Sequence, residues 1–261
     1  MHTSIDLGGR AAVITGGAGG IGSATGVAMG AAGARVLLVD IDEDRLAPAA
    51  EAVAATGAEV QTRVADVTSS TDVRGYVAAA LDAFGTIDVF FNNAAIIGPI
   101  GTLAEYDEDA FDRIMAVNVR GVFLGLRHVL PVMLARRSGS IINTGSISSE
   151  RGLPGTPAYN AAKHALNALT ANARTDLHAK CPDVHVTLVT PGVVSTDFHR
   201  NALGGSPPLP PNVPSQSAAE VAAAIVAAID HPAAEVYTNP ALARTVLKYF
   251  QDVAAFEREL S

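Results

Sequence analysis

The sequence predicts a three-layer α/β fold, in which a doubly wound, mostly parallel sheet of seven strands is flanked by helices. Short apolar runs rich in β-branched residues alternate with longer, alanine-rich windows that have helical spacing. Several short runs are apolar at nearly every position, which is typical of parallel strands buried on both faces. This alternation predicts right-handed βαβ units. The chain has 261 residues, of which 49% are hydrophobic, and we expect one domain over residues 1–261.

The short apolar runs predict strands at Ala11–Thr15, Arg35–Val39, Glu59–Val64, Val89–Asn92, Ser140–Thr144, His185–Thr190 and Glu235–Thr238. The predicted helices are Gly20–Ala32, Glu43–Thr56, Thr71–Phe84, Asp109–Arg136, Pro157–Lys180 and Ser217–Ile229. Pro131 lies inside the longest window and predicts a bend or an early end there. After Asn239, apolar residues at helical spacing predict one amphipathic C-terminal helix over about residues 240–258.

Charge and cysteine content argue against several classes of function. A net charge of -8 leaves no basic stripe for a nucleic-acid backbone, so we expect no nucleic-acid partner. The single cysteine excludes a disulfide framework, and the histidines lack metal-ligand spacing, so no metal site is expected. The start of the sequence lacks a secretory signal, and the uncharged stretch Ala11–Ala34 fits a strand, turn and helix better than a membrane span. We expect a cytoplasmic protein without an integral membrane segment.

The first predicted strand runs directly into the glycine-rich stretch "TGGAGGIG", Thr15–Gly22. Glycine lets the backbone approach a pyrophosphate, and the helix that follows presents unpaired N–H groups to the anion. Asp40 ends the next strand, where a carboxylate can accept ribose hydroxyls and would repel a 2′-phosphate. No cation lies within Gly16–Gly22, and Ile41 follows Asp40, which favours NAD over NADP. The other role for an acid here, a helix N-cap, suits Asp42 better.

Further motifs follow in order, namely "ADV" at Asp66, "NNAA" at Asn92–Ala95, "VNVRG" around Asn118, "INTGSIS" around Ser146, "YNAAK" at Tyr159–Lys163 and "PGVVST" at Pro191–Thr196. Together with the glycine turn, they resemble the short-chain dehydrogenase/reductase family from about Leu7 to Thr196. Ala95 replaces a glycine that is usual in that family. The resemblance implies a Rossmann-type fold and hydride transfer between NAD and the carbon of a secondary alcohol or ketone.

The resemblance also implies a catalytic tetrad of Asn118, Ser146, Tyr159 and Lys163, with Asn118 holding a water that links Lys163 to solvent. An interhelical hydrogen bond is the other interpretation of Asn118. Cofactor-binding positions of the family correspond here to Gly16, Gly20, Ile21, Gly22, Asp40, Ile41, Asp66, Val67, Asn92, Tyr159, Lys163, Pro191, Gly192, Val194 and Thr196.

The four-residue spacing of Tyr159 and Lys163 places both side chains on one helix face. A free tyrosine has a pKa of about 10, which is too high for a base at neutral pH. An ammonium about 4 Å away contributes about 4 kcal/mol at an effective dielectric constant of about 20, or about three pKa units. We therefore expect Lys163, helped by the positive nicotinamide ring of the cofactor, to bring the pKa of Tyr159 near 7, so that the phenol can act as general acid and base. Ser146 would donate a hydrogen bond to the substrate oxygen.

We expect the substrate to contact Ser148, Leu153 and Phe198, and a loop at about residues 197–216 whose Pro-rich part spans 204–214. Because the candidate loops are mostly apolar, they favour a hydrophobic alcohol or ketone that is steroid-like, terpenoid or aromatic. We expect a homodimer through the helices Asp109–Arg136 and Pro157–Lys180, and the sequence leaves a tetramer open. Two alternatives also remain, namely an NAD(H)-binding redox sensor without catalysis and an epimerase or dehydratase on the same fold.

Overall fold

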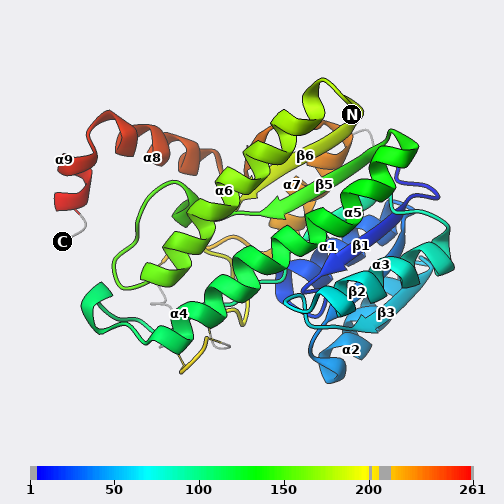
Figure 1. Ribbon diagram of the computed structural model, residues 1–261, viewed down its shortest axis with the longest axis horizontal. Coiled ribbons are helices and arrows are strands. Elements are labelled where there is room, and N and C mark those ends of the chain that lie inside the picture. Colours follow the sequence, from blue (N-terminus) through cyan, green and yellow to red (C-terminus); the bar gives the residue numbers. More distant parts are fainter. Residues whose placement is uncertain (1–4, 200–201, 206–212, 260–261) are drawn as a thin grey trace.

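The structure is a computed structural model that describes residues 5–199, 202–205 and 213–259 (Figure 1). Its strands are β1 (Ala11–Thr15), β2 (Arg35–Asp40), β3 (Val60–Val64), β4 (Val89–Asn92), β5 (Gly139–Thr144), β6 (Val184–Thr190) and β7 (Glu235–Tyr237). Its α-helices are α1 (Gly20–Ala31), α2 (Glu43–Ala54), α3 (Ser70–Phe84), α4 (Glu108–Met115), α5 (Val122–Arg136), α6 (Pro157–His178), α7 (Ala218–Asp230), α8 (Pro240–Gln251) and α9 (Val253–Arg258). Shorter helical turns are η1 (Leu103–Glu105), η2 (Ala116–Gly121) and η3 (Ile147–Ser149).

The strands form one parallel sheet in the order β3-β2-β1-β4-β5-β6-β7, which confirms the predicted doubly wound arrangement. The chain begins at the centre with β1, moves outward to β3, and returns to β4 on the other side of β1. Ala12 pairs with Val36 of β2 on one side and with Val89 of β4 on the other. In open α/β sheets, ligands bind at the carboxyl ends of the strands beside such a reversal.

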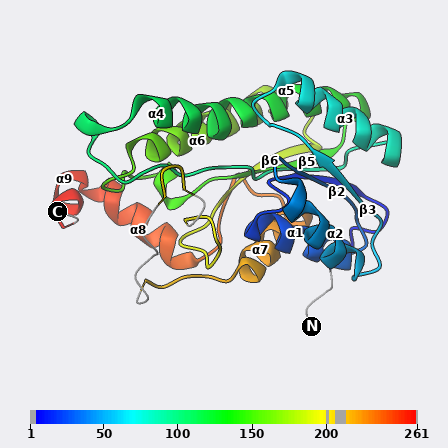
Figure 2. The ribbon, with the colours of Figure 1, turned by 90° about the horizontal axis from the view of Figure 1, so that it is seen from below.

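Helices cover both faces of the sheet, and Figure 2 shows α3, α5 and α6 on one face with α1, α2 and α7 on the other. In β1, Ala11 and Val13 join the core beneath the first group of helices, while Ala12 and Ile14 join the core beneath the second. Neither face of this strand meets water, which explains why the sequence is apolar at consecutive positions. The predicted three-layer fold is therefore confirmed.

The predicted helix over residues 109–136 is interrupted at a place that the sequence did not indicate. Pro131 lies inside α5, and the helix continues past it to Arg136. The irregular part is instead the π-helical turn η2, which contains Asn118 and joins α4 to α5. A π-helical turn accommodates one extra residue and occurs frequently at functional sites. The early end that the sequence offered at Pro131 was therefore wrong, because α5 continues to Arg136.

Within the described ranges, the continuous helical segment Glu108–Arg136 is long and apolar enough to cross a membrane. Half of its most apolar window is buried inside the fold. A helix that packs on a sheet meets the same length and composition criteria, so the segment is only weak evidence for a membrane span.

The C-terminal segment contains two helices where the sequence predicted one. At Asp252 the backbone becomes extended, with φ of -154° and ψ of 89°. The Asp252 carboxylate then accepts a hydrogen bond of 2.9 Å from the backbone N–H of Ala255, which caps α9. The apolar spacing continues across this break, which is why helical periodicity did not reveal it. Figure 1 shows α8 leaving the end of the sheet, with α9 at its far end.

Candidate active site

The glycine-rich stretch forms a tight turn between β1 and α1. Gly16 has φ of +64°, and a Cβ there would lie 2.8 Å from the Cα of Ala94. A Cβ on Gly22 would collide with the carbonyl oxygen of Gly16. The backbone at this turn therefore lies closer to its neighbours than any side chain would permit. Helix α1 begins directly after the turn, and no side chain caps the first N–H groups of the helix, which have no partner within it.

Asp40 stands at the end of β2 and braces this turn. One carboxylate oxygen accepts a 3.0 Å hydrogen bond from the backbone N–H of Ala18, and the other accepts one of 3.2 Å from the N–H of Asp42. A carboxylate has about four acceptor positions, so both oxygens keep capacity for a ligand. Asp42 caps α2 through the N–H of Arg45 at 3.1 Å, in agreement with the role the sequence favoured.

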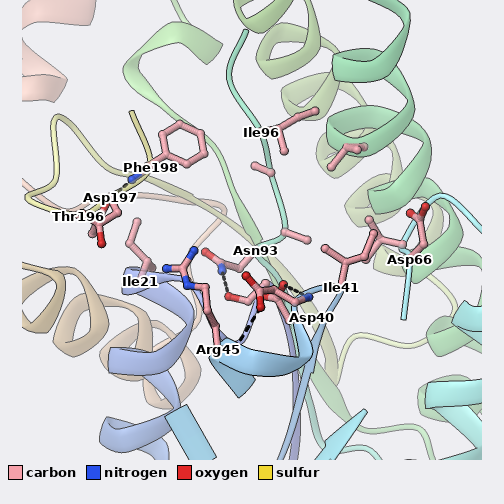
Figure 3. Close-up of a pocket in the computed structure, with 18 of the residues that line it drawn as sticks. Ile21, Asp40, Ile41, Arg45, Asp66, Asn93, Ile96, Thr196, Asp197 and Phe198 are labelled. Atoms are coloured by element: carbon pink, nitrogen blue, oxygen red, sulfur yellow. Dashed lines mark hydrogen bonds between the residues drawn. The ribbon is translucent and has the colours of Figure 1, made fainter. Parts of the chain in front are cut away.

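A pocket of about 380 Å³ opens at the carboxyl ends of β1 and β2 (Figure 3). The predicted cofactor residues that line it are Gly16, Gly20, Ile21, Asp40, Ile41, Asp66, Val67 and Thr196. Phe198, a predicted substrate residue, lies at the pocket as well. The structure therefore brings together, at one site, residues from β1 to beyond β6.

Two cations at the pocket were missed by the sequence reasoning. The side chain of Arg45 comes from α2 and lines the pocket beside Asp40 and Ile41 (Figure 3). Arg113 on α4 also lines the pocket, with its Nη2 atom 4.0 Å from Oδ2 of Asp66. Neither residue lies where the sequence points to such a cation, which is within the glycine turn or directly after Asp40. Arg45 lies five residues after Asp40, where the first turn of α2 returns to the pocket.

Asn92 and Asn93 point in different directions from the end of β4. Asn92 is buried and donates a 3.0 Å hydrogen bond to the side chain of Asn143, so it does not line the pocket. Asn93 lines the pocket and donates bonds of 3.1 Å to the carbonyl oxygens of Thr15 and Gly16. Of the two adjacent amides, Asn93 therefore reaches the site, and Asn92 supports the sheet beneath it.

Asn118 in the π-helical turn binds the backbone of Ile96. Its Oδ1 atom accepts a 2.8 Å bond from the N–H of Ile96, and its Nδ2 atom donates a 2.9 Å bond to the carbonyl oxygen of the same residue. The amide is buried and fastens the segment after β4, whose residues Ala94–Ile96 line the pocket. The partner of Asn118 is thus a loop backbone, and within the described part of the chain it forms no interhelical hydrogen bond.

Ser146 follows β5 and begins η3. Its Oγ atom accepts a 3.2 Å bond from the N–H of Ser148, while its own N–H donates to Oγ of Ser149 at 3.0 Å. This reciprocal pair fixes the serine at the carboxyl edge of the sheet. Ser148 is buried, and its hydroxyl has no hydrogen-bond partner among the described residues.

Tyr159 and Lys163 lie on the first two turns of α6, which begins with Pro157. The Lys163 ammonium is buried and donates a 2.7 Å bond to the carbonyl oxygen of Thr144, at the end of β5. Its Nζ atom is 5.6 Å from the centroid of the Tyr159 ring. The Tyr159 ring also contacts that of Phe198, with 6.0 Å between the two centroids and 58° between the ring planes.

The expected direction of the Tyr159 pKa shift was wrong for the protein alone. Burial raises the pKa of Tyr159 to about 12, although a hydrogen bond with the Ser146 side chain acts in the opposite direction. Burial also lowers the pKa of Lys163 to about 7, so this amine carries only part of a positive charge near neutral pH. Desolvation therefore exceeds the attraction that the four-residue spacing suggested.

The predicted segment Pro191–Thr196 follows β6 beside these residues. The carbonyl oxygen of Pro191 accepts a 3.2 Å bond from the N–H of Ile147, and Val194 forms a β-bridge with Gln216. Gly192 lies against Leu242 of α8, and a Cβ added to the glycine would be 3.3 Å from Cδ1 of that leucine.

The predicted substrate residues differ in their positions. Leu153 is half-buried in the loop before α6, where its carbonyl oxygen accepts a 2.7 Å bond from the Asn160 side chain. Residues 200–201 and 206–212 of the predicted substrate loop, including most of its Pro-rich part, lie outside the described residues. Among the residues that the structure does describe, no three His, Cys, Asp or Glu side chains gather as a metal site.

The parallel sheet, with its glycine turn and a pocket at the reversal between β1 and β4, defines a Rossmann-type α/β protein. A family model described as short chain dehydrogenase matches residues 10–204. The chain belongs to the short-chain dehydrogenase/reductase family.

Several curated relatives are similar over most of their length. Levodione reductase of Leifsonia aquatica is 38% identical over 196 residues, which cover 74% of this chain and 73% of the relative. (+)-Borneol dehydrogenase 2 of Salvia officinalis is 34% identical, with 73% and 66% covered, and 2-(S)-hydroxypropyl-CoM dehydrogenase 3 of Xanthobacter autotrophicus is 36% identical, with 93% and 90% covered. A solved short-chain dehydrogenase/reductase of Burkholderia phymatum, in complex with NAD, is 30% identical with a TM-score of 0.87, covering 97% of this chain and 96% of that one.

Proposed function

We propose that the protein is an NAD-dependent oxidoreductase that interconverts a secondary alcohol and a ketone. The observation that carries this proposal is the cluster of Ser146, Tyr159 and Lys163, in which the Ser146 hydroxyl acts on the Tyr159 phenol and a buried amine lies one helical turn along α6. A positioned proton donor and a second hydrogen-bond donor are what a carbonyl oxygen needs as it becomes an alcohol.

The residues at the pocket fit a nicotinamide dinucleotide. A turn whose close packing excludes side chains at Gly16 and Gly22, directly before the uncapped N-terminus of α1, suits a pyrophosphate. Asp40 and Ile41 would hold the adenosine ribose, and Asp66 and Val67 would hold the adenine. Thr196 and the adjoining segment would hold the nicotinamide, which supplies or accepts the hydride when bound.

The choice of NAD over NADP rests on Asp40, with Arg45 as a counterweight. The carboxylate keeps acceptor capacity for ribose hydroxyls and would repel a 2′-phosphate. Arg45 lies on the same side of the pocket and would reduce that repulsion. We retain NAD because two backbone N–H groups fix the Asp40 carboxylate at the end of β2. Its negative charge therefore stays at the pocket, where it would face the 2′-phosphate of NADP.

In ketone reduction, the neutral Tyr159 phenol would donate its proton to the substrate oxygen, and Ser146 would donate a hydrogen bond to the same atom. The raised pKa of Tyr159 keeps the phenol protonated at neutral pH, which suits this direction. In alcohol oxidation, the proton moves from the alcohol to a Tyr159 phenolate, which protonated Lys163 would stabilise. Asn118 would position the pocket wall through Ile96.

Apolar groups that line the pocket support a substrate class. Ile96 and the ring of Phe198 face this space, and Phe198 packs against Tyr159. We therefore propose a hydrophobic alcohol or ketone of steroid-like, terpenoid or aromatic type. The names of levodione reductase and (+)-borneol dehydrogenase 2 are in keeping with it.

We also propose that two copies form a homodimer through α4, α5 and α6, and that the chain acts as one catalytic domain in the cytoplasm. An apolar groove on these helices is lined by Met115, Ala116, Val119, Phe123 and Leu169. The Phe123 side chain there is 45% exposed, as expected for a surface that a partner covers. A monomeric mass in light scattering would reject the dimer.

The experiment that tests the function is NADH formation by the purified protein with NAD and a panel of steroid, terpenoid, aromatic and short aliphatic secondary alcohols. Turnover with one hydrophobic class supports the proposal and identifies that class. Tight NADH binding without turnover in either direction would favour the redox sensor instead. Conversion of the substrate without net NADH formation would favour an epimerase or dehydratase.

A further inference from the structure

The C-terminal tail, α8 and α9, touches two segments that flank Tyr159. At its root, Leu242 of α8 lies over Gly192, in the segment after β6. At its tip, the ring of Phe256 in α9 lies 5.2 Å from the guanidinium of Arg151. Arg151 belongs to the connecting loop, residues 150–156, which joins η3 to α6. The tail therefore connects the segment after β6 with the loop before α6. It contains none of the motifs that carry the family resemblance.

Phe256 is the centre of this contact. It is 9% exposed although α9 has only six residues, and it is surrounded by Arg151, Lys248 and Tyr249. The Lys248 ammonium lies 5.5 Å from the Phe256 ring and pairs with Glu259 at 2.7 Å. The Tyr249 ring meets that of Phe256 edge-on, with 5.6 Å between centroids. Two cations and one aromatic edge thus hold the same ring.

Arg151 depends on this ring for its contacts. Its Nε and Nη1 atoms are buried and have no hydrogen-bond partner within the described part of the chain. Arg151 is half-buried, and two buried guanidinium nitrogens without such partners are costly; the face of an aromatic ring is the compensation present here. Removing the ring would leave the guanidinium without that contact, so Arg151 and the loop would move toward water.

The connecting loop matters because both of its ends carry site residues. Before it, η3 begins at Ser146, and the N–H of Arg151 donates to the carbonyl oxygen of Ile147 at 3.3 Å. After it comes α6, in which Asn160 directly follows Tyr159. The Asn160 side chain donates a hydrogen bond to the carbonyl oxygen of Leu153 in the loop. Any displacement at Arg151 is therefore transmitted to the segments on either side.

We propose that Phe256, acting through Arg151, is a positioning residue that holds the connecting loop in place and thereby sets the affinity of the site for its alcohol or ketone. This inference rests on the proposed function for its kinetic consequence, but the contact itself does not. The tail has no pocket-lining residue, so cofactor binding should not depend on it.

The test compares Phe256→Ala with Phe250→Ala, a matched control in the same tail. Phe250 is 62% exposed, and its one described ring contact is with Tyr249. We expect Phe256→Ala to raise KM for the alcohol about tenfold, with a smaller change in kcat, while Phe250→Ala leaves both unchanged. The dissociation constant for NADH should be the same in all three proteins, which also shows that the variants are folded. Phe256→Tyr, which keeps an aromatic face, should restore most of the loss.

Amide hydrogen exchange of residues 150–156 gives a readout that needs no substrate. Exchange there should accelerate in Phe256→Ala and in Arg151→Met but not in Phe250→Ala, and the double variant should be no faster than either single one. Equal exchange in wild type and Phe256→Ala would overturn the inference, as would an equal effect of Phe250→Ala. If the wild type turns over no alcohol, but exchange is still faster in Phe256→Ala than in the wild type, the proposed function fails and the loop contact stands.

Discussion

The Nζ atom of Lys163 lies 5.6 Å from the centre of the Tyr159 ring, one helical turn away, and donates its hydrogen bond to the carbonyl oxygen of Thr144. The lysine is therefore attached to the end of β5 and does not depend on Tyr159 for its position. Both side chains lose hydration at this depth, and burial shifts their pKa values toward the neutral form of each.

Tyr159→Phe removes the proposed proton donor without changing the shape of the ring. We expect turnover to fall by about 10² to 10⁴, the range typical of general acid–base catalysis, while NADH binding stays unchanged. Steady-state rates and fluorescence titration measure the two quantities. Tyr76→Phe is the control, since that hydroxyl is buried in the core without a described hydrogen-bond partner. Loss of NADH binding in Tyr159→Phe would assign a structural role to the phenol.

The rate of alcohol oxidation should rise with pH through the alkaline range. Oxidation needs the Tyr159 phenolate, and burial raises the pKa of this phenol to about 12. Below the pKa, the phenolate fraction grows about tenfold for each pH unit. Ketone reduction uses the phenol and should not rise over the same range. Single-turnover rates from pH 6 to 10 in both directions measure this, and a plateau of oxidation near pH 7 would show that nearby positive charge outweighs burial.

Asp40→Asn and Arg45→Ala should shift the cofactor preference in opposite directions. Asn keeps an acceptor for the N–H of Ala18 but removes the charge, so the preference for NAD over NADP should fall about tenfold. Removing Arg45 takes away the cation beside the carboxylate and should strengthen that preference. Ratios of kcat/KM for the two cofactors measure both effects. The control is Asp44→Ala, which removes an exposed acid on α2, the helix that carries Arg45. A wild type that prefers NADP would contradict the assignment of Asp40.

Lys163 should make the protein more stable as the pH rises from 7 toward 10. Burial lowers the pKa of this amine from 10.5 to about 7, so the unfolded chain binds the extra proton throughout that window. Stability increases with pH wherever the unfolded state binds more protons. In Lys163→Met this contribution is absent, and the free energy of unfolding should rise less. Urea unfolding at pH 7, 8 and 9 makes the comparison, and parallel pH dependences would mean that the ammonium is not desolvated.

The sheet could be predicted closely because burial on both faces leaves a direct record in the sequence. The runs that became β1 and β4 were bounded correctly, and β2 extends the predicted strand by one residue. The glycine turn and Asp40 were also found, since each lies directly after a strand. The position of a residue at the end of a strand is set mainly by the strand itself, so such a residue can be placed from the sequence.

The features that could not be predicted depend on hydrogen-bond geometry, on the direction of an element or on how deeply a side chain is buried. The break at Asp252 leaves helical spacing intact, and the approach of Arg45 to the pocket depends on the direction of α2. The direction of the Tyr159 pKa shift depends on how far water is excluded, which residue spacing does not record. Likewise, Asn92 and Asn93 differ in role only because adjacent residues at a strand end point in different directions.

The π-helical turn at Ala116–Gly121 has a consequence for how this chain can change in length. Deleting one of its residues would return the segment to a regular α-helix, with better backbone hydrogen bonds. It would also rotate α4 relative to α5 by about 100°. Either the apolar side chains of α5 would turn away from the sheet, or Asn118 would lose the backbone of Ile96. Surface loops can gain or lose residues at little cost, whereas at this turn a gain in local regularity would disrupt the pocket wall.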